Sequence, residues 1–189
     1  DQGYENGSIR FSYTNNSSES MLPNSDLQSH NFNLRAVAKL SDKLTIDSKA
    51  TYFTQKINNN NQVTGAQGLL DNLYVIPRNV NQNDLRNYQV DNPSNVFEYQ
   101  SISYASGQEG NPYWMLLNDE QSERRNRFLG FTKIDYKFTN WLSAFARVGA
   151  DITNIDFSKV YKPGHHFYAG GRMNIRNIIY GELNSDFLI

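Results

Sequence analysis

Apolar and polar side chains alternate with a period of two along six segments of this 189-residue sequence. Leu142 and Ala144, for example, share the face opposite Ser143. This period is typical of β-strands whose two faces meet different surroundings. Several segments reach about ten residues, the length of a tilted membrane strand. We therefore expect an all-β fold with about six antiparallel strands, at residues 8–14, 31–40, 44–55, 127–138, 142–152 and 173–189.

The connections between the expected strands alternate in length. Two are tight turns inside a repeated phrase, Lys39-Leu-Ser-Asp-Lys-Leu-Thr45 and Lys137-Phe-Thr-Asn-Trp-Leu-Ser143, which recurs after 98 residues. Asp and Asn suit such turns because their side chains bond the local backbone. Short periplasmic turns that alternate with long extracellular loops are typical of a transmembrane β-barrel. The expected long loops are residues 15–29, 57–123 and 153–171.

The composition favours a barrel wall over a soluble domain. Hydrophobic residues make up only 38% of the chain, yet it contains 12 Tyr and 11 Phe. So polar a soluble domain would bury a small core, whereas disordered chains are poor in aromatics. The net charge of −1 gives no basic surface for nucleic acid, and the absence of Cys excludes disulfides and thiolate metal ligands. No apolar run is long enough for a transmembrane helix.

The chain is expected to be an internal part of a larger barrel. Residues 1–10 lack the apolar segment of a signal peptide, so an exported protein of this kind would have lost its N-terminus or extend beyond this sequence. Six strands also leave two unpaired edges. We expect residues 1–189 to form a partial barrel domain whose long loop, 57–123, contains a short helix at 66–75 that ends before Pro77. Turns are expected at Asn92-Pro93 and Asn111-Pro112.

Several phrases in order resemble the SusC/RagA-type TonB-dependent transporters of Bacteroidetes. They are Met21-Leu-Pro-Asn-Ser25, Asn111-Pro-Tyr-Trp-Met-Leu-Leu117, Arg124-Arg-Asn-Arg-Phe-Leu-Gly130, Trp141-Leu-Ser143, Val148-Gly-Ala-Asp151 and Ile179-Tyr-Gly-Glu-Leu-Asn-Ser-Asp-Phe-Leu188. The resemblance covers nearly the whole chain. It depends on the order and spacing of all these phrases rather than on any one of them.

The resemblance implies active import across the outer membrane of a Gram-negative bacterium. Members of this family have a 22-stranded barrel around an N-terminal plug, and a SusD-like surface lipoprotein closes over the mouth. Energy reaches them through TonB, ExbB and ExbD, and the cargo is an oligosaccharide or an oligopeptide. The plug, the TonB-binding segment and the remaining barrel would lie outside this sequence, and the alternation implies contact with membrane lipid.

Charged residues on the polar faces of the strands are candidates for facing the barrel lumen. They could line the cargo path or contact the plug, or they could simply hydrate the wall and pair across strands; the second interpretation is favoured because a polar lumen is the default for a barrel. The candidates are Arg35, Lys39, Asp47, Lys49, Lys133, Asp135, Arg147 and Asp151.

Tyr113 and Trp114 are candidate contacts for a ligand or a lid, because aromatic faces stack on sugars. They could equally anchor the packing of the long loop, which the family phrase favours. His165-His166 invites a metal interpretation, but adjacent residues in an extended segment diverge and no further ligand follows, so a solvated loop without metal is expected. No catalytic motif or cofactor loop is present, and we do not expect an enzyme.

Three functions follow from these patterns. The first is part of a TonB-dependent nutrient importer. The second is a soluble β-sandwich that binds glycans, in which the apolar faces pack on each other. The third is a passive outer-membrane porin without TonB coupling. The cargo itself is left open between sugar and peptide.

Overall fold

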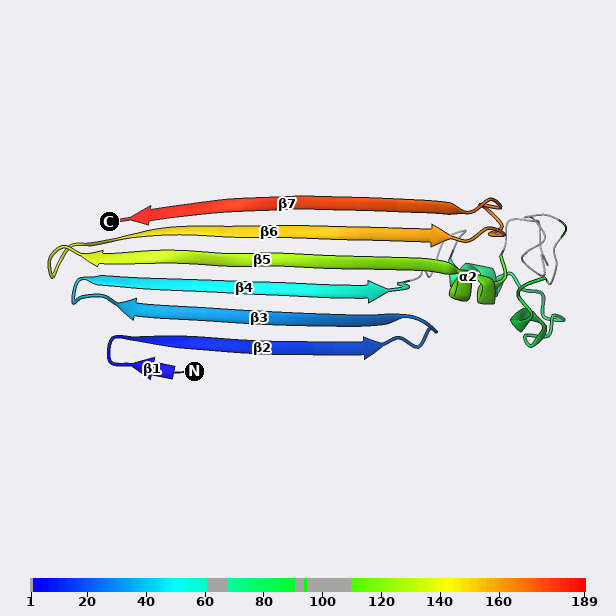
Figure 1. The fold of residues 1–189 in the computed structure, drawn as a ribbon, viewed down its shortest axis with the longest axis horizontal. Coiled ribbons are helices and arrows are strands. Elements are labelled where there is room, and N and C mark those ends of the chain that lie inside the picture. The colour runs from blue at the N-terminus through cyan, green and yellow to red at the C-terminus, as the bar shows by residue number, and fades with distance from the viewer. Residues whose placement is uncertain (1, 61–67, 91–93, 95–109) are drawn as a thin grey trace.

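The computed structural model describes residues 2–60, 68–90, 94 and 110–189, and within them the chain forms one open antiparallel sheet (Figure 1). Strands pair in sequence order, each with its neighbours along the chain. The all-β prediction is confirmed. The strands are β1 (Gln2–Tyr4), β2 (Gly7–Glu19), β3 (Asp26–Lys39), β4 (Leu44–Asn58), β5 (Asp119–Lys137), β6 (Ser143–Tyr161) and β7 (Arg172–Leu188).

The sheet has one strand more than the six predicted, and most strands are longer than predicted. β1 has three residues, too few to show a period, and it pairs with β2 through a turn at Glu5 and Asn6. β5 begins at Asp119 rather than at residue 127, and β6 continues to Tyr161 rather than to residue 152. The segment added to β5 is polar on both faces, so it carries little alternation. In the segment added to β6 the alternation changes phase, because Ile155 and Phe157 stand at odd positions, which carry Arg147 and Asp151 earlier in the strand. Both backbones nevertheless continue the hydrogen-bonded ladder.

The two ends of the sheet differ in the length of their connections. At one end, the turn end, β1–β2, β3–β4 and β5–β6 are joined by short turns. At the other end, the loop end, the connections are residues 20–25, 59–118 and 162–171. The loops predicted at 15–29, 57–123 and 153–171 are therefore too long by the strand residues at their borders, but their sorting to one end is correct.

The repeated phrase forms two equivalent turns. The Leu40 N–H donates to the Leu44 carbonyl at 2.9 Å, and the Phe138 N–H donates to the Leu142 carbonyl at 3.0 Å. A hydroxyl closes each turn: the Leu44 N–H donates to Ser41 Oγ at 3.1 Å, and the Leu142 N–H donates to Thr139 Oγ1 at 3.1 Å. These local bonds fix both hairpins and thereby set the register of the strands that follow.

The short helical elements lie in the connection between β4 and β5. They are α1 (Leu69–Tyr74), the 3-10 turn η1 (Asp84–Arg86) and α2 (Pro112–Asn118). Helix α1 is shorter than the predicted 66–75. The turn predicted at Asn111-Pro112 is wrong, because Asn111 caps α2 and Pro112 is its first residue, where a missing N–H costs nothing. The turn predicted at Asn92-Pro93 lies outside the described residues, as do the first two residues of the predicted helix, 66 and 67.

The buried apolar side chains lie at the loop end rather than on the sheet. Leu69, Leu85, Trp114 and Met115 are buried among the helical elements, and Tyr161 is buried at the end of β6. No helix in the described part of the chain is long and apolar enough to cross a membrane. The sheet itself is a single layer whose two faces are open (Figure 1).

Candidate functional site

The strand register places the regularly alternating apolar residues of the long strands on one face, the apolar face, although some apolar residues, such as Val37 and Leu129, lie on the other. Tyr13 pairs with Phe32, which pairs with Tyr52, and Tyr52 pairs with Phe128. Phe128 in turn pairs with another large apolar residue, Ile152. No strand is shifted by a residue, so the alternation that each segment shows in sequence adds up to one continuous surface.

We call the part of this face between the ladder rows of Leu44 and Tyr52 the apolar band. Its side chains are exposed or half-buried, Val148 being 61% exposed, because the described residues form no second layer over them. An exposed apolar surface of this extent is typical of a site that contacts a protein, a ligand or a membrane. The band contains Ile9, Phe11 and Tyr13; Phe32, Leu34, Ala36 and Ala38; Leu44, Ile46, Ser48, Ala50 and Tyr52; Phe128, Gly130, Thr132, Ile134 and Tyr136; Ala144, Ala146, Val148, Ala150 and Ile152; and Gly181, Leu183, Ser185 and Phe187.

Aromatic side chains border the band on its loop side. The rings of Tyr13 and Phe32 are 4.8 Å apart, and those of Phe32 and Tyr52 are 6.5 Å apart. Phe128 continues this row on β5, where it lies opposite Tyr52. Of these rings, Tyr13 and Tyr52 carry a polar hydroxyl, and rings with a polar tip favour the boundary between an apolar and an aqueous phase. The row therefore marks a boundary across four neighbouring strands.

A second aromatic group lies at the turn end. Tyr136 and Phe138 pack edge to face with their centroids 4.8 Å apart, and Trp141 in the following turn is 84% exposed. Because Trp141 belongs to a turn, the strand alternation does not assign it to either face. Aromatic residues therefore stand at both borders of the apolar band.

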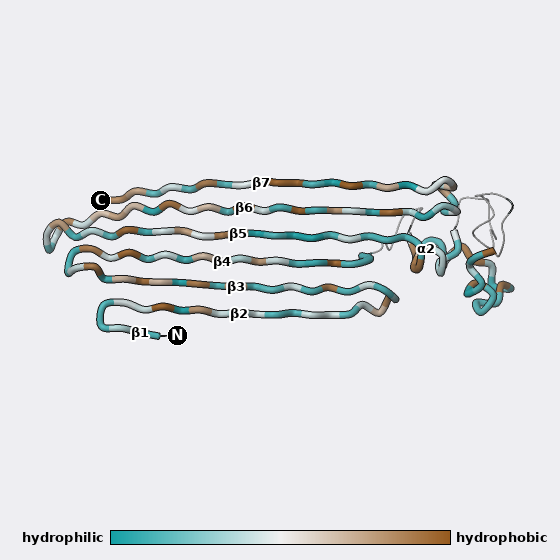
Figure 2. Tube along the Cα trace, viewed as in Figure 1, coloured by the Kyte–Doolittle hydropathy of each residue, from teal (hydrophilic) through white to brown (hydrophobic). Residues whose placement is uncertain are grey.

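Above the aromatic row, towards the loop end, the same face becomes polar on β2 to β6, whereas β7 continues it with the exposed Ile179, Ile175 and Met173. The next ladder row contains Asn15, His30, Thr54, Asn126 and Asn154. Thr54 Oγ1 donates to Asn126 Oδ1 at 2.8 Å, and the Tyr13 hydroxyl and His30 Nδ1 are 2.8 Å apart. Figure 2 shows the resulting change along β2 to β5, whose hydrophobic residues gather towards the turn end.

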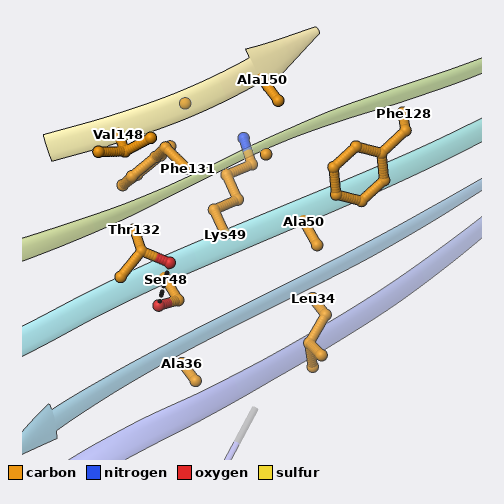
Figure 3. A pocket seen from close by; sticks show the side chains of 12 residues that line it. Leu34, Ala36, Ser48, Lys49, Ala50, Phe128, Phe131, Thr132, Val148 and Ala150 are labelled. Atoms are coloured by element: carbon orange, nitrogen blue, oxygen red, sulfur yellow. Dashed lines mark hydrogen bonds between the residues drawn. The ribbon is translucent and has the colours of Figure 1, made fainter. Parts of the chain in front are cut away.

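Small residues hollow the middle of the apolar band. Ala36, Ala50, Gly130 and Ala150 line a shallow depression beneath the larger Leu34, Phe128 and Val148 (Figure 3). Two hydroxyls on its floor, Ser48 Oγ and Thr132 Oγ1, hydrogen bond to each other at 3.0 Å. This mutual bond gives each of the two hydroxyls a partner on the apolar face.

The opposite face, the charged face, carries all eight residues that the sequence marked as lumen candidates. Most are bonded to carboxylates or cations next to them. Arg35 forms a bidentate pair with Asp47, with Nε–Oδ1 at 3.0 Å and Nη2–Oδ2 at 2.7 Å. Lys133 Nζ lies 2.6 Å from Asp135 Oδ1 on the same strand. Mutual pairing is what the hydrated-wall interpretation of these residues requires.

Two members of this network were not among the candidates. Arg147 binds Asp186 of β7, and Asp151 binds Arg127 of β5. Asp186 lies directly opposite Arg147, whereas Arg127 meets Asp151 diagonally, so only the register identifies the partners. Alternation alone places Asp186 and Arg127 on the polar face without indicating which residue each meets.

Lys39 and Lys49 complete the predicted set and are placed differently from the paired residues. Lys49 lies opposite Arg35, so two cations adjoin in one ladder row. Lys39 is at the last position of β3, next to the turn end. Neither has a carboxylate within ion-pair distance in the described part of the chain.

The loop between β4 and β5 buries one of the two candidate aromatic contacts. Trp114 is 3% exposed and packs edge to face on Tyr88 at 6.3 Å, whereas Tyr113 is half-buried. Asn111 is fully buried: its Nδ2 donates to the Leu85 carbonyl at 3.0 Å, and its Oδ1 accepts from the Tyr113 N–H at 2.9 Å. In this conformation Trp114 is an anchor of the loop, and only Tyr113 offers surface to a ligand.

His165 is fully buried, so the solvated loop expected at 165–166 is wrong for this residue. Its Nδ1 accepts a hydrogen bond from the Phe167 N–H at 3.1 Å, and its Nε2 lies 3.5 Å from Asp119 Oδ2. Tyr161 packs edge to face on the imidazole at 4.8 Å. The turn between β6 and β7 thus folds back onto the start of β5, and no acidic or histidine cluster of metal-binding size occurs among the described residues.

A scan against protein-family models and a search of curated proteins found no match to this chain. The two faces of the sheet and its loop end are therefore the basis for inferring a function.

Proposed function

We propose that this chain is part of the wall of an outer-membrane β-barrel. The observation that carries the proposal is the apolar band, a continuous exposed surface with charges on the reverse side of the same strands. A barrel wall places lipid on one face and water on the other. The band faces lipid in this proposal, and the charged face lines the lumen.

The height of the band fits a membrane. On β4 it extends over the nine residues from Leu44 to Tyr52. A transmembrane strand tilted by about 45° crosses the hydrocarbon core in about 9–11 residues. Aromatic residues at both borders match the girdles that flank the apolar zone of such barrels. The strand segments beyond Tyr52 then extend above the membrane, which accounts for their polar character on the apolar face.

The open sheet needs further strands. β1 and β7 are its edges, and unpaired backbone groups cannot remain in lipid. We propose that the remaining barrel of the same parent protein supplies them. In this arrangement the turn end faces the periplasm, and the loop end faces the outside of the cell.

We further propose that the parent is an importer of the SusC/RagA type. The ordered phrases in the sequence support this, together with long loops sorted to one end of the sheet. The importer would take up oligosaccharides or oligopeptides with a SusD-like lipoprotein over its mouth. TonB would supply the energy through a plug encoded outside this sequence. Transport, not catalysis, is the proposed activity.

The alternatives make different demands on the apolar band. A soluble glycan-binding β-sandwich would pack the band against a second sheet, and the seven strands of the described residues lie in one. A passive porin would use the same wall without TonB. Porin and importer share the membrane wall and differ in whether TonB drives transport. The wall and the dependence on TonB therefore require separate tests.

Accessibility measurements on single-cysteine variants test the wall. The chain has no native cysteine, so each substitution adds the only thiol for a spin label. Labels at Val148→Cys and Ala150→Cys, in protein reconstituted into vesicles, should collide with oxygen, which dissolves in lipid. Labels at Phe145→Cys and Gly149→Cys should collide with a water-soluble nickel chelate. Above the band, Asn154→Cys should also meet the chelate, although it lies on the apolar face.

A sandwich predicts another outcome. Labels at Val148 and Ala150 would then be shielded from both reagents, which would refute the membrane wall. For the importer, cells that produce the parent protein should lose cargo uptake when TonB is deleted. Uptake that continues without TonB would favour the porin.

A further inference from the structure

The upper part of the charged face, near the loop end, carries three cations. Among the described residues they have no carboxylate partner of the kind that Arg147 finds in Asp186 lower on the same strands. Lys159 lies on β6, and Arg172 and Arg176 lie on β7. Their ladder rows are consecutive: Tyr161 pairs with Arg172, Lys159 with Asn174, and Phe157 with Arg176. All three therefore project from the same face within one small area.

Aromatic rings, rather than acids, hold these cations. Lys159 Nζ lies 4.7 Å from the centroid of Tyr161. The guanidinium carbons of Arg172 and Arg176 lie 4.8 Å and 5.1 Å from the centroids of Tyr168 and Phe157. A ring attracts a cation through its face without neutralising it. The rings therefore position the three cations and leave their charge and their N–H groups available.

The local balance of charge favours an anionic ligand. From the row of Arg125 to the row of Arg172, the charged face of β5, β6 and β7 carries four cations and two carboxylates. Both carboxylates are engaged elsewhere: Glu123 binds Arg125 at 3.1 Å, and the buried Asp119 faces His165. In the described part of the chain no acid lies within ion-pair distance of Lys159, Arg172 or Arg176.

The middle of the sheet pairs most of its charges in a different way. There, Arg147 and Asp186 pair across the same two strands, β6 and β7. A wall that only needs hydration balances its charges in this way. Arg172 and Arg176 are exposed and Lys159 is half-buried, so at least the two arginines are accessible from solvent.

The geometry points to an acidic oligosaccharide as the ligand. We propose that Lys159, Arg172 and Arg176 bind carboxylate or sulfate groups repeated along a sugar chain. Arg172 and Arg176 are four residues apart on an extended strand, a span of ~13 Å that a single small anion cannot bridge. An extended oligomer reaches both.

Amide side chains beside the cations suit the hydroxyl groups of a sugar. Gln121 and Asn174 flank Lys159 in one ladder row, so the row reads amide, cation, amide. Amides both donate and accept hydrogen bonds, as sugar hydroxyls do. The inference rests on the proposed function, because only then does this face lead from the mouth of a barrel into its lumen. It narrows the cargo from oligosaccharides or oligopeptides to acidic oligosaccharides.

Calorimetric titration of the protein in detergent micelles tests the site. The probes are a hexameric oligogalacturonate and its fully methyl-esterified form, which has the same sugars without the charges. The acid form should bind at least tenfold more tightly than the ester. The double variant R172Q/R176Q should bind the acid form about tenfold or more weakly, because it loses two charge-assisted contacts. The double variant R172K/R176K keeps the charges and should retain most of the affinity.

Lys49→Gln is the matched control, because it removes a cation from the same charged face. Lys49 lies at the level of the apolar band, far from Lys159, Arg172 and Arg176. The affinity of this variant for the acid hexamer should stay within twofold of that of the unsubstituted protein. Equal losses in K49Q and R172Q/R176Q would overturn the site in favour of a general field effect. Unchanged binding in R172Q/R176Q, or equal binding of the ester, would also overturn it. Hexaglutamate that binds as tightly would overturn the assignment to a sugar.

Flotation of the same variants with lipid vesicles separates this inference from the proposed function. All of them should float with the vesicles, since the substituted residues lie off the apolar band. Variants that float but show no preference for the acid hexamer refute the site alone. An unsubstituted protein that does not float with the vesicles refutes the proposal that the sheet is a membrane wall.

Discussion

Tyr52 and Phe128 lie directly opposite each other in the β4–β5 ladder, at the level where the apolar face ends. One row further, Thr54 donates a hydrogen bond to Asn126, and no large apolar residue follows on these two strands of that face. The change from ring to amide within one row gives the boundary between the proposed lipid zone and the water above it. The effect of a substitution on this face should therefore depend on the side of the boundary where it lies.

A charge placed on the apolar face should cost more inside the band than above it. Val148 lies in the row of Ser48, midway between Leu44 and Tyr52, whereas Asn154 lies above the aromatic row on the same strand and face. In a barrel wall, arginine costs about 2–4 kcal/mol at the bilayer midplane and about 0–1 kcal/mol near the interface. We expect these costs for Val148→Arg and Asn154→Arg in urea unfolding from vesicles. Equal costs for the two would contradict a membrane at this level.

Gly130 should resist substitution, because Phe128 and the β4 backbone fill the space beside it. A Cβ at Gly130 would lie 2.9 Å from the Lys49 carbonyl oxygen and 3.1 Å from the Phe128 ring. We expect Gly130→Ala to lower the free energy of unfolding by about 1–3 kcal/mol through overpacking.

Gly181 on the same face provides the control for this substitution. A Cβ at Gly181 would have Ile152 Cγ1 as its nearest neighbour at 3.5 Å, an ordinary contact. Gly181→Ala should be neutral or raise stability by up to ~1 kcal/mol, because it restricts the unfolded chain. Urea titration of both variants in one detergent decides the matter, and a Gly181→Ala protein as unstable as Gly130→Ala would be inconsistent with this packing.

Asn111 should stabilise the loop between β4 and β5 without affecting the sheet. Loss of its hydrogen bonds to Leu85 and Tyr113 in Asn111→Ala should cost about 1–3 kcal/mol, because buried polar partners are left unsatisfied. Local opening of a loop does not require the sheet to unfold. Hydrogen exchange of residues 110–118 should therefore accelerate at least about tenfold, while that of β6 stays constant. The exposed Asn79 offers the control Asn79→Ala, which should change neither.

The two tryptophans should report opposite surroundings. In Trp141→Phe the remaining Trp114 is buried, and in Trp114→Phe the remaining Trp141 is exposed. Acrylamide added to both variants in the same detergent should quench Trp141 several-fold more strongly than Trp114. The emission maximum of Trp114 should also lie at the shorter wavelength. Equal quenching would show that the loop is open and that Trp114 is available to ligands.

The strand pattern was readable in the sequence only where the alternation keeps one phase. From residue 142 to 152, apolar residues recur at every second position, and the prediction placed this segment in a strand. From 153 to 161 the phase changes, because Ile155 and Phe157 stand at odd positions, so the pattern of residues 142–152 did not extend the predicted strand there. Pairing with β5 and β7 decides that this segment is a strand, since ladder hydrogen bonds do not depend on side-chain polarity.

The candidate site divides in the same way. The parity of each residue determines its face, so Arg35, Asp47 and Arg147 were correctly grouped with the other charged residues. Their partners could not be inferred, because a pair such as Arg127 and Asp151 is diagonal and its two members lie 24 residues apart in the chain. Register, a property of the assembled sheet, is needed to choose between the neighbours.

The sequence by itself determined the period of two, the tight turns at both copies of the repeated phrase, and hence the sorting of side chains into two faces. These are local properties, since alternation and turn chemistry need only neighbouring residues. Only the tertiary structure decided which side chains the loop end buries, because Trp114 and His165 meet partners distant in the chain. It also decided that Lys159 and Arg172 lie close together, because pairing in the ladder brings β6 and β7 side by side. Each of these two cations packs on an aromatic ring rather than on an acid.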